Sequence, residues 1–195
     1  MKTFKKILFA LFATTMVIGF TSCSDDDDGS SVKGMYSFKE LDTMRKMSAD
    51  NLIKKLTRDG YTYSSYEDID EDDVYVAYEF RKDARNKEYY VECSPTLNGI
   101  DFRVSERSNQ LDQKILTSIL DDEKKFAGNN TLKKITVSLY DEPEKFYDKE
   151  AAKEAFLSYN GFISRMTCYY DGFYTVIKYY KDGGEVMYGY SIYKN

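Results

Sequence analysis

The sequence predicts an α+β fold in which antiparallel meander strands are packed by three to four helices. Three observations predict this class. Apolar and polar residues alternate in several short runs, as expected for strands with one buried face. Apolar residues recur at helical spacing in other segments. Asparagine and glycine turns separate consecutive strand-like runs, so neighbouring strands are expected to pair as hairpins.

The first half of the chain predicts two helices followed by a meander. Ser37 and Glu40 form a capping box that begins a short helix. Ser48 is the N-cap candidate of a second helix, which Gly60 ends. Alternating strand patterns then cover residues 74–81, 89–93 and 100–104, and the turn before the last of these contains Asn98-Gly99.

The second half places a longer helix and a strand before another helix and meander. Ser108 is the expected cap of a longer helix whose apolar stripe covers residues 111–120, and Asn129-Asn130 breaks that helix. The following elements are a strand at 132–140, a helix at 148–159, and strands at 162–169, 173–180 and 186–193.

Helix followed by meander therefore occurs twice, in candidate halves 35–106 and 107–195. The repetition indicates either an ancient duplication or the ordinary order of elements in α+β proteins. In topology alone it resembles the small secreted inhibitor folds that bind β-lactamases, and such a likeness is an analogy.

The N-terminus carries a segment that is too short to span a membrane. Lys2, Lys5 and Lys6 precede an uncharged run of 14 residues, Ile7–Phe20, whereas a spanning helix needs about 20. The run ends in the sequence Phe20-Thr21-Ser22-Cys23, which resembles the lipobox of bacterial lipoproteins. The resemblance implies a signal peptide at 1–22, palmitate and other acyl chains on Cys23, a tether at 23–34 and one domain at 35–195. The alternative is an ordinary cleaved signal followed by an incidental cysteine.

The residues after Cys23 specify the expected location further. They resemble the acidic export signal of surface-exposed Bacteroidetes lipoproteins and comprise Ser24, Asp25, Asp26, Asp27 and Asp28. The resemblance implies a lipid-anchored protein of the outer membrane, on its cell-surface face. The same run also reads as a solvated tether, because like charges keep a chain extended.

The amino-acid composition excludes several classes of catalytic, metal-binding and nucleic-acid-binding site. The chain has no histidine, which excludes Ser-His-Asp and Cys-His catalysis and every histidine-ligated metal site. Its net charge of −5 lacks the basic footprint of a nucleic-acid-binding protein. No cofactor is predicted. Cys93 and Cys168, both in strand patterns, either form a disulfide or act as small buried apolar residues.

The acidic segment Glu67–Asp73 is the densest charge feature of the domain. Asp68, Asp70 and Asp72 have the spacing that begins an EF-hand loop. Asp73, however, stands where that loop requires glycine. These three aspartates are therefore weak metal candidates, and a solvated acidic loop is the favoured interpretation.

The C-terminal hairpin is the candidate binding surface. Tyr174 and Tyr180 share one face of its first strand, and Tyr188 and Tyr190 share one face of its second. Exposed tyrosines would serve glycan or protein binding, whereas buried ones would simply line a half-buried sheet. A separate motif, Asp42-Thr43-Met44, matches the O-glycosylation triplet of Bacteroidetes and makes Thr43 a candidate acceptor.

These observations favour a non-catalytic surface lipoprotein that binds a glycan or an envelope protein. The alternative is an inhibitor-like or immunity-like module that docks on an enzyme with its sheet. A carboxylate-based hydrolase is the third interpretation. A glycan-binding protein should expose coplanar tyrosine rings, and a hydrolase should hold two carboxylates facing each other in a deep pocket.

Overall fold

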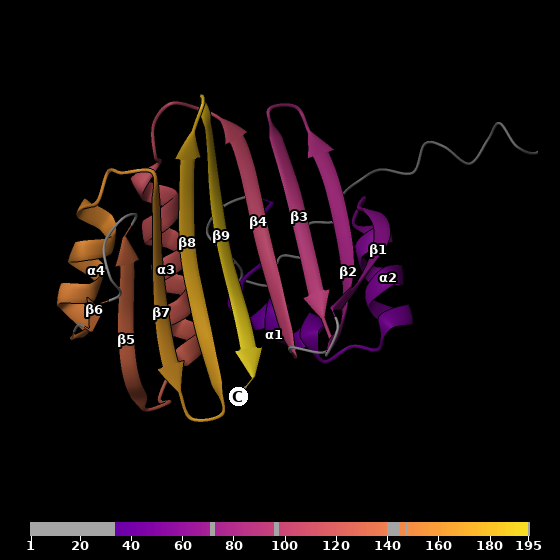
Figure 1. Ribbon diagram of the computed structural model, residues 1–195, viewed down its shortest axis with the longest axis horizontal. Coiled ribbons are helices and arrows are strands. Elements are labelled where there is room, and N and C mark those ends of the chain that lie inside the picture. Colours follow the sequence, from indigo (N-terminus) through magenta and orange to yellow (C-terminus); the bar gives the residue numbers. More distant parts are fainter. Residues whose placement is uncertain (1–33, 71–72, 96–97, 140–144, 147, 195) are drawn as a thin grey trace, which may run out of the picture.

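The computed structural model describes residues 34–194 except 71–72, 96–97, 140–144 and 147, and it omits the side chains of 66–76 and 145–146. These residues form one antiparallel sheet of nine strands, in the order β1-β2-β3-β4-β9-β8-β7-β5-β6 (Figure 1). The predicted α+β class with an antiparallel meander sheet is confirmed. The strands are Thr62–Asp70, Asp73–Ala84, Lys87–Ser94, Gly99–Arg107, Leu132–Leu139, Lys145–Phe146, Ile163–Tyr170, Phe173–Asp182 and Glu185–Lys194, numbered β1 to β9.

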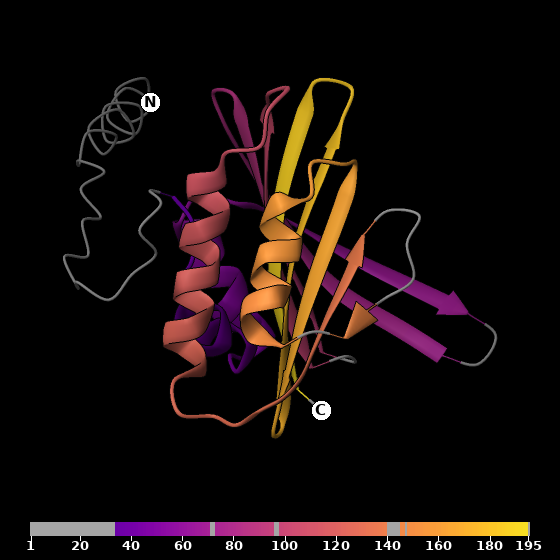
Figure 2. The ribbon, with the colours of Figure 1, turned by 90° about the vertical axis from the view of Figure 1, so that its left-hand side faces the viewer.

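Four helices lie against one face of this sheet (Figure 2). They are α1 (Phe38–Arg45), α2 (Ala49–Arg58), α3 (Gln113–Ala127) and α4 (Lys149–Ser158). None of the described helices covers the other face, which is called the open face below and is turned toward the viewer in Figure 1. The molecule therefore has two layers, and its apolar core lies between them.

Local sequence explains most helix boundaries. Ser37 and Glu40 form the expected capping box of α1. Ser48 is the N-cap residue of α2, and Gly60 follows that helix with a φ of +90°. The prediction that Ser108 caps the longer helix is wrong. Asp112 caps α3 instead, because its carboxylate accepts the Lys114 N–H at 2.9 Å.

The two halves of the chain join at the centre of the sheet. The meanders β1-β2-β3-β4 and β7-β8-β9 meet where β4 pairs with β9 in antiparallel register. Each meander is preceded by a helix, α2 or α4, near an opposite end of the sheet (Figure 1). This is the arrangement that a helix-then-meander repeat predicts, and common descent of the two halves stays a prediction.

Buried tyrosines fasten the helix layer to the sheet. The Tyr190 hydroxyl donates to the Tyr36 carbonyl just before α1. The Tyr188 hydroxyl accepts the N–H of Asp112, the cap of α3, at 2.7 Å. The Tyr179 hydroxyl donates to the carbonyl of the residue that follows α4. Each ring contributes apolar burial and about 1 kcal/mol of net hydrogen bonding at a helix end, which is one physical use of a tyrosine-rich composition.

The strand order also decides the state of the cysteines. Cys93 and Cys168 are both buried and free. They lie on β3 and β7, which are separated by three strands. At a spacing of about 4.8 Å per strand their backbones are about 19 Å apart, far beyond disulfide reach. Of the two alternatives, the structure therefore selects small buried apolar residues.

Candidate functional site

A row of tyrosines crosses the open face of the sheet. Tyr193 on β9, Tyr174 on β8 and Tyr169 on β7 lie directly opposite one another in the strand register. The ring centroids of Tyr193 and Tyr174 are 4.9 Å apart, with 17° between their planes. Those of Tyr174 and Tyr169 are 5.6 Å apart, with 29° between planes. Strand register therefore stacks three rings, and each pair contributes about 0.5–1.5 kcal/mol beyond its burial.

Both ends of this tyrosine stack are closed. Lys134, opposite Tyr169 on β5, places its ammonium 5.0 Å from the Tyr169 ring centroid. At the other end, the Tyr193 ring lies against Gly99 of β4, where an added Cβ would be 2.2 Å from its Cδ1 atom. The ring faces are thus occupied by one another, by the lysine and by the glycine backbone. A sugar ring stacks on an open aromatic face, so this arrangement differs from a coplanar sugar-binding platform.

An ion-pair network lies beside the stack, at the centre of the open face. Asp101 accepts from Arg103 Nε at 2.6 Å and from Lys178 Nζ at 3.1 Å, with one carboxylate oxygen serving both. Arg103 also pairs with Glu92 on β3. The Lys178 side chain passes over Gly189, where an added Cβ would be 2.7 Å from its Cε atom. The second oxygen of Asp101 is buried and has no hydrogen-bond partner among the described residues.

Arg165 differs from these paired cations. It lies on β7 directly opposite Lys178, and its side chain is exposed. Lys178 is drawn toward Asp101, so it does not share a counterion with Arg165. Within the described part of the chain no carboxylate lies within ion-pair distance of Arg165. Burial raises the pKa of the neighbouring Tyr174 hydroxyl, while the positive charge of Arg165 acts in the opposite direction.

The four tyrosines predicted to form a binding surface do not share one face. Tyr174 and Tyr180 are half-buried on the open face. Tyr188 and Tyr190 lie on the helix-covered face and are 0% and 2% exposed, so the prediction is wrong for these two. The reason is the register of the turn: Asp182 pairs with Glu185, which sets Tyr180 opposite Met187 rather than Tyr188.

The acidic segment is not the loop that the sequence predicts. Glu67–Asp70 belong to β1 and Asp73 begins β2. The side chains of Asp68 and Asp70, and all of Asp72, lie outside the described residues. In the described remainder of the chain no three acidic or cysteine side chains lie together so as to hold a metal ion.

The other predicted positions stay untested. Cys23 and the acidic run Ser24–Asp28 lie outside the described residues. Thr43 is exposed on α1, where its hydroxyl donates to the Lys39 carbonyl at 2.9 Å. Its glycosylation therefore remains a prediction.

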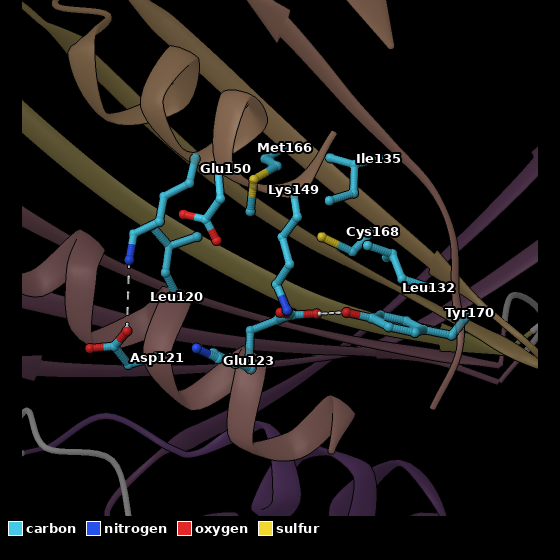
Figure 3. A pocket seen from close by; sticks show the side chains of 12 residues that line it. Leu120, Asp121, Glu123, Leu132, Ile135, Lys149, Glu150, Met166, Cys168 and Tyr170 are labelled. Carbon is cyan, nitrogen blue, oxygen red and sulfur yellow. Dashed lines mark hydrogen bonds and ion pairs between the residues drawn. The ribbon is translucent and has the colours of Figure 1, made fainter. Parts of the chain in front are cut away.

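A small cavity opens between α3, α4, β5 and β7 (Figure 3). Its volume is about 60 Å³, enough for about two water molecules. A drug-sized ligand needs several hundred cubic ångströms. The walls are mainly Leu120, Leu132, Ile135 and Met166, and the rim carries lysines from both helices.

The cavity contains one buried carboxyl group, that of Glu123. One oxygen accepts from the Tyr170 hydroxyl at 2.8 Å and from the Thr175 hydroxyl at 2.9 Å. Burial raises the pKa of Glu123, and the positive charge of Lys149, which extends toward it from α4 in Figure 3, partly opposes that shift. Burial also raises the pKa of the Cys168 thiol to about 12, which disfavours the reactive thiolate. The other carboxylates of the lining, Asp121 and Glu150, are exposed.

Sequence reasoning missed several of these residues. Glu123 has a visible signal, because it occupies a position of the α3 apolar stripe that continues to Ala127. Arg165 and Tyr169 alternate with buried residues on β7, but periodicity alone does not say which face stays open. The sequence pattern assigns Gly99 only to a turn, whereas its lack of a Cβ also makes room for the Tyr193 ring.

Within the described residues no helix is both long and apolar enough to cross a membrane. No protein-family model, no curated protein and no solved structure matches this chain.

Proposed function

We propose that this protein is a lipid-anchored, surface-exposed outer-membrane lipoprotein that docks a partner macromolecule on the open face of its sheet and carries out no catalysis itself. The observation that carries the proposal is the open face, where tyrosines and arginines stand on a rigid sheet that no described helix covers. Tyrosine and arginine are enriched among the residues that dominate binding energy in protein interfaces.

The point where the chain enters the domain supports this orientation. Tyr36 packs edge-on against Phe102, with ring centroids 5.6 Å apart, on the helix-covered face. Gly34 lies beside the Tyr89 hydroxyl on the same side. The described chain therefore enters the domain at the helix layer, on the side opposite the open face, and an anchor at Cys23 would leave the open face free for a partner.

The cavity at Glu123, one of several hollows in the described residues and smaller than those of about 220 and 290 Å³, gives little support to an enzyme. It offers a single buried carboxyl group whose hydrogen-bonded oxygen already serves two hydroxyl groups, and its volume is far below that of a substrate pocket. The open face is the larger feature and the one whose side chains reach solvent.

Site-specific crosslinking in the native cells tests the docking proposal. A photo-crosslinking amino acid replaces Met187, which lies on the open face outside the tyrosine stack. The matched control replaces Lys54, an exposed residue of α2 in the helix layer. A discrete adduct from Met187 and none from Lys54 supports docking, whereas equal labelling at both positions, or none at Met187, argues against it.

The proposed location has its own test. The Cys23→Ala protein should no longer fractionate with membranes, and protease added to intact cells should degrade the wild-type domain. Retention of the Cys23→Ala protein in the membrane fraction would contradict lipid anchoring. Survival of the wild-type domain in intact cells would place it on the inner face.

An inhibitor-like module is the second candidate, and the β1–β2 hairpin favours it. In Figure 2 this hairpin projects beyond the body of the sheet, away from the helices. The strands of this hairpin include Glu67, Asp68, Asp70 and Asp73. A projecting acidic hairpin suits insertion into a basic cleft. If amide substitutions at these four positions abolish the Met187 adduct, the hairpin takes part in docking.

A further inference from the structure

Another cavity lies at the end of the sheet, where β3 ends near the turn between α1 and α2 (Figure 1). We call it the Arg45 cavity, and its volume is about 220 Å³. Tyr78 and Cys93, which pair across β2 and β3, place it on the helix-covered side of the sheet. Its described lining is Arg45, Met47, Ala49, Leu52, Tyr78, Cys93, Ser94, Pro95, Asn98 and Gly99.

The described lining contains one charged residue, Arg45, and no acidic residue. The side chain of Arg45 is only 8% exposed. Asp42, which lies outside the lining, accepts from Arg45 Nη2 at 2.6 Å and also pairs with Lys46. One carboxylate is therefore shared by two cations, and this group of three residues keeps a net positive charge beside the cavity. Such a charge attracts an anion more strongly in a buried site than in water.

The Arg45 cavity also has hydrogen-bond donors to spare. A guanidinium carries five N–H groups. Asp42 accepts from two of those of Arg45, and the Asn98 side-chain oxygen accepts from a third at 2.7 Å. The remaining two have no acceptor among the described residues. Ala49, the first residue of α2, lines the same cavity, and the N-cap residue Ser48 makes no side-chain bond to that helix end. Its free N–H groups add to the preference for an anion.

The apolar walls set the size and character of a ligand. Met47, Leu52, Tyr78 and Pro95 supply most of the apolar lining. An apolar cavity of about 150 Å³ accepts benzene, so the Arg45 cavity has room for a ring or short chain that also bears a carboxylate. A purely apolar ligand would leave the spare N–H groups of Arg45 unpaired, at a cost in binding free energy.

We propose that the Arg45 cavity binds a small organic carboxylate, whose apolar body packs against Met47, Leu52 and Pro95 and whose carboxylate pairs with Arg45. The planar fork of a guanidinium matches a carboxylate in a bidentate pair. This site is separate from the open face, so it does not depend on the proposed docking function.

Binding of a simple aromatic carboxylate tests the proposal. The probe is 4-fluorobenzoate, titrated with the purified full chain in neutral detergent micelles and followed by its ¹⁹F NMR signal. The expected result is saturable binding with a dissociation constant of about 1 mM or below. The neutral analogue 4-fluorobenzyl alcohol, which has the same ring, should bind at least tenfold more weakly because it lacks the carboxylate.

Two variants locate the site, and each has a matched control. Ala49→Leu places a larger side chain in the cavity and should weaken 4-fluorobenzoate binding at least tenfold. Its control is Ala151→Leu, in the first turn of α4 and outside the described lining. Arg45→Lys keeps the charge but removes the fork, and it should weaken binding at least fivefold. Its control is Arg58→Lys, at an exposed arginine at the end of α2.

Both controls should change the dissociation constant by less than twofold. Absence of saturable binding would mean that the cavity holds only water and would overturn the proposal. Equal binding of the alcohol and the carboxylate would overturn the role of Arg45. An unchanged affinity in Ala49→Leu, or equal losses in Ala49→Leu and Ala151→Leu, would show that the probe binds elsewhere. None of these results depends on the Met187 adduct, so failure here leaves the docking proposal standing.

Discussion

Replacing Gly99 with alanine tests how the tyrosine stack is held. A Cβ at this position would lie 2.2 Å from Cδ1 and 2.5 Å from Cε1 of Tyr193. Ordinary van der Waals contact begins at 3.4 Å, so the ring must retreat by about 1.2 Å. It cannot retreat along the stack, because Tyr174 is already in contact with its other face. The ring must swing toward solvent instead.

The expected cost follows from what the ring loses. Displacement removes one stacked pair, about 0.5–1.5 kcal/mol, together with part of the burial of the Tyr193 ring. Gly99→Ala should therefore lower the free energy of unfolding by about 2 kcal/mol in urea denaturation. Gly189→Ala is the matched control on the same face. The nearest atoms there belong to the flexible Lys178 side chain, so the cost should stay near or below about 1 kcal/mol.

A double-mutant cycle isolates the contact. In a Tyr193→Ala background the added Cβ meets no ring, so Gly99→Ala should lose most of its effect, and the two substitutions should couple by about 1 kcal/mol or more. The reasoning would be refuted if Gly99→Ala and Gly189→Ala lowered the free energy of unfolding equally, or if the effects of Gly99→Ala and Tyr193→Ala were additive. Either result would mean that the Tyr193 ring does not depend on the space left by Gly99.

Three further results are expected. Asp101→Ala should lower the free energy of unfolding by about 2–4 kcal/mol, because it leaves two partly buried cations without the carboxylate that they share. Urea denaturation at neutral pH measures this loss, and a loss below about 0.5 kcal/mol would contradict the stabilising role of Asp101. The pKa of Glu123 is raised by burial, so the folded protein holds this proton more tightly than the unfolded chain does and loses stability as pH rises above the ordinary value of 4.5. The unfolding free energy of Glu123→Gln minus that of the wild type should therefore increase between pH 4 and 7, and a flat difference would contradict the shift. Burial raises the pKa of Cys93 to about 11 and of Cys168 to about 12, so neither thiol should react with a disulfide reagent at pH 8 until the protein unfolds.

Local sequence patterns predict the presence of a helix or strand better than the residues at which it begins and ends. The capping box at Ser37 and Glu40 placed α1 correctly, because a cap is a contact between residues three apart. The sequence predicts the start of α3 too early, since Ser108 also has a side chain that can cap a helix but Asp112 makes the contact. The strand β1 was missed in favour of an acidic loop. Backbone hydrogen bonds to β2 hold β1 in the sheet, and its polar sequence does not indicate that pairing.

The candidate site was predictable only in part. The sequence showed two aromatic faces on the last hairpin and left open which one was covered. The two-residue turn at Gly183-Gly184 settles this, because a shift of one residue in register moves every side chain to the other face. Tyr174 therefore reaches the open face, and Tyr190 enters the core against Phe38.

The sequence by itself determined the class of fold, the alternation that buries one face of each strand, and the absence of histidine chemistry, because these depend on residue type and on spacings of a few residues. The tertiary structure alone decided that β4 pairs with β9, that Cys93 and Cys168 lie three strands apart, and that Tyr169, Tyr174 and Tyr193 stack on the open face. Each of these depends on pairing between segments tens of residues apart. The periodicity of a segment does not specify which strand will pair with it. The tyrosines and cations of different strands therefore come to lie on one surface only when the sheet is assembled.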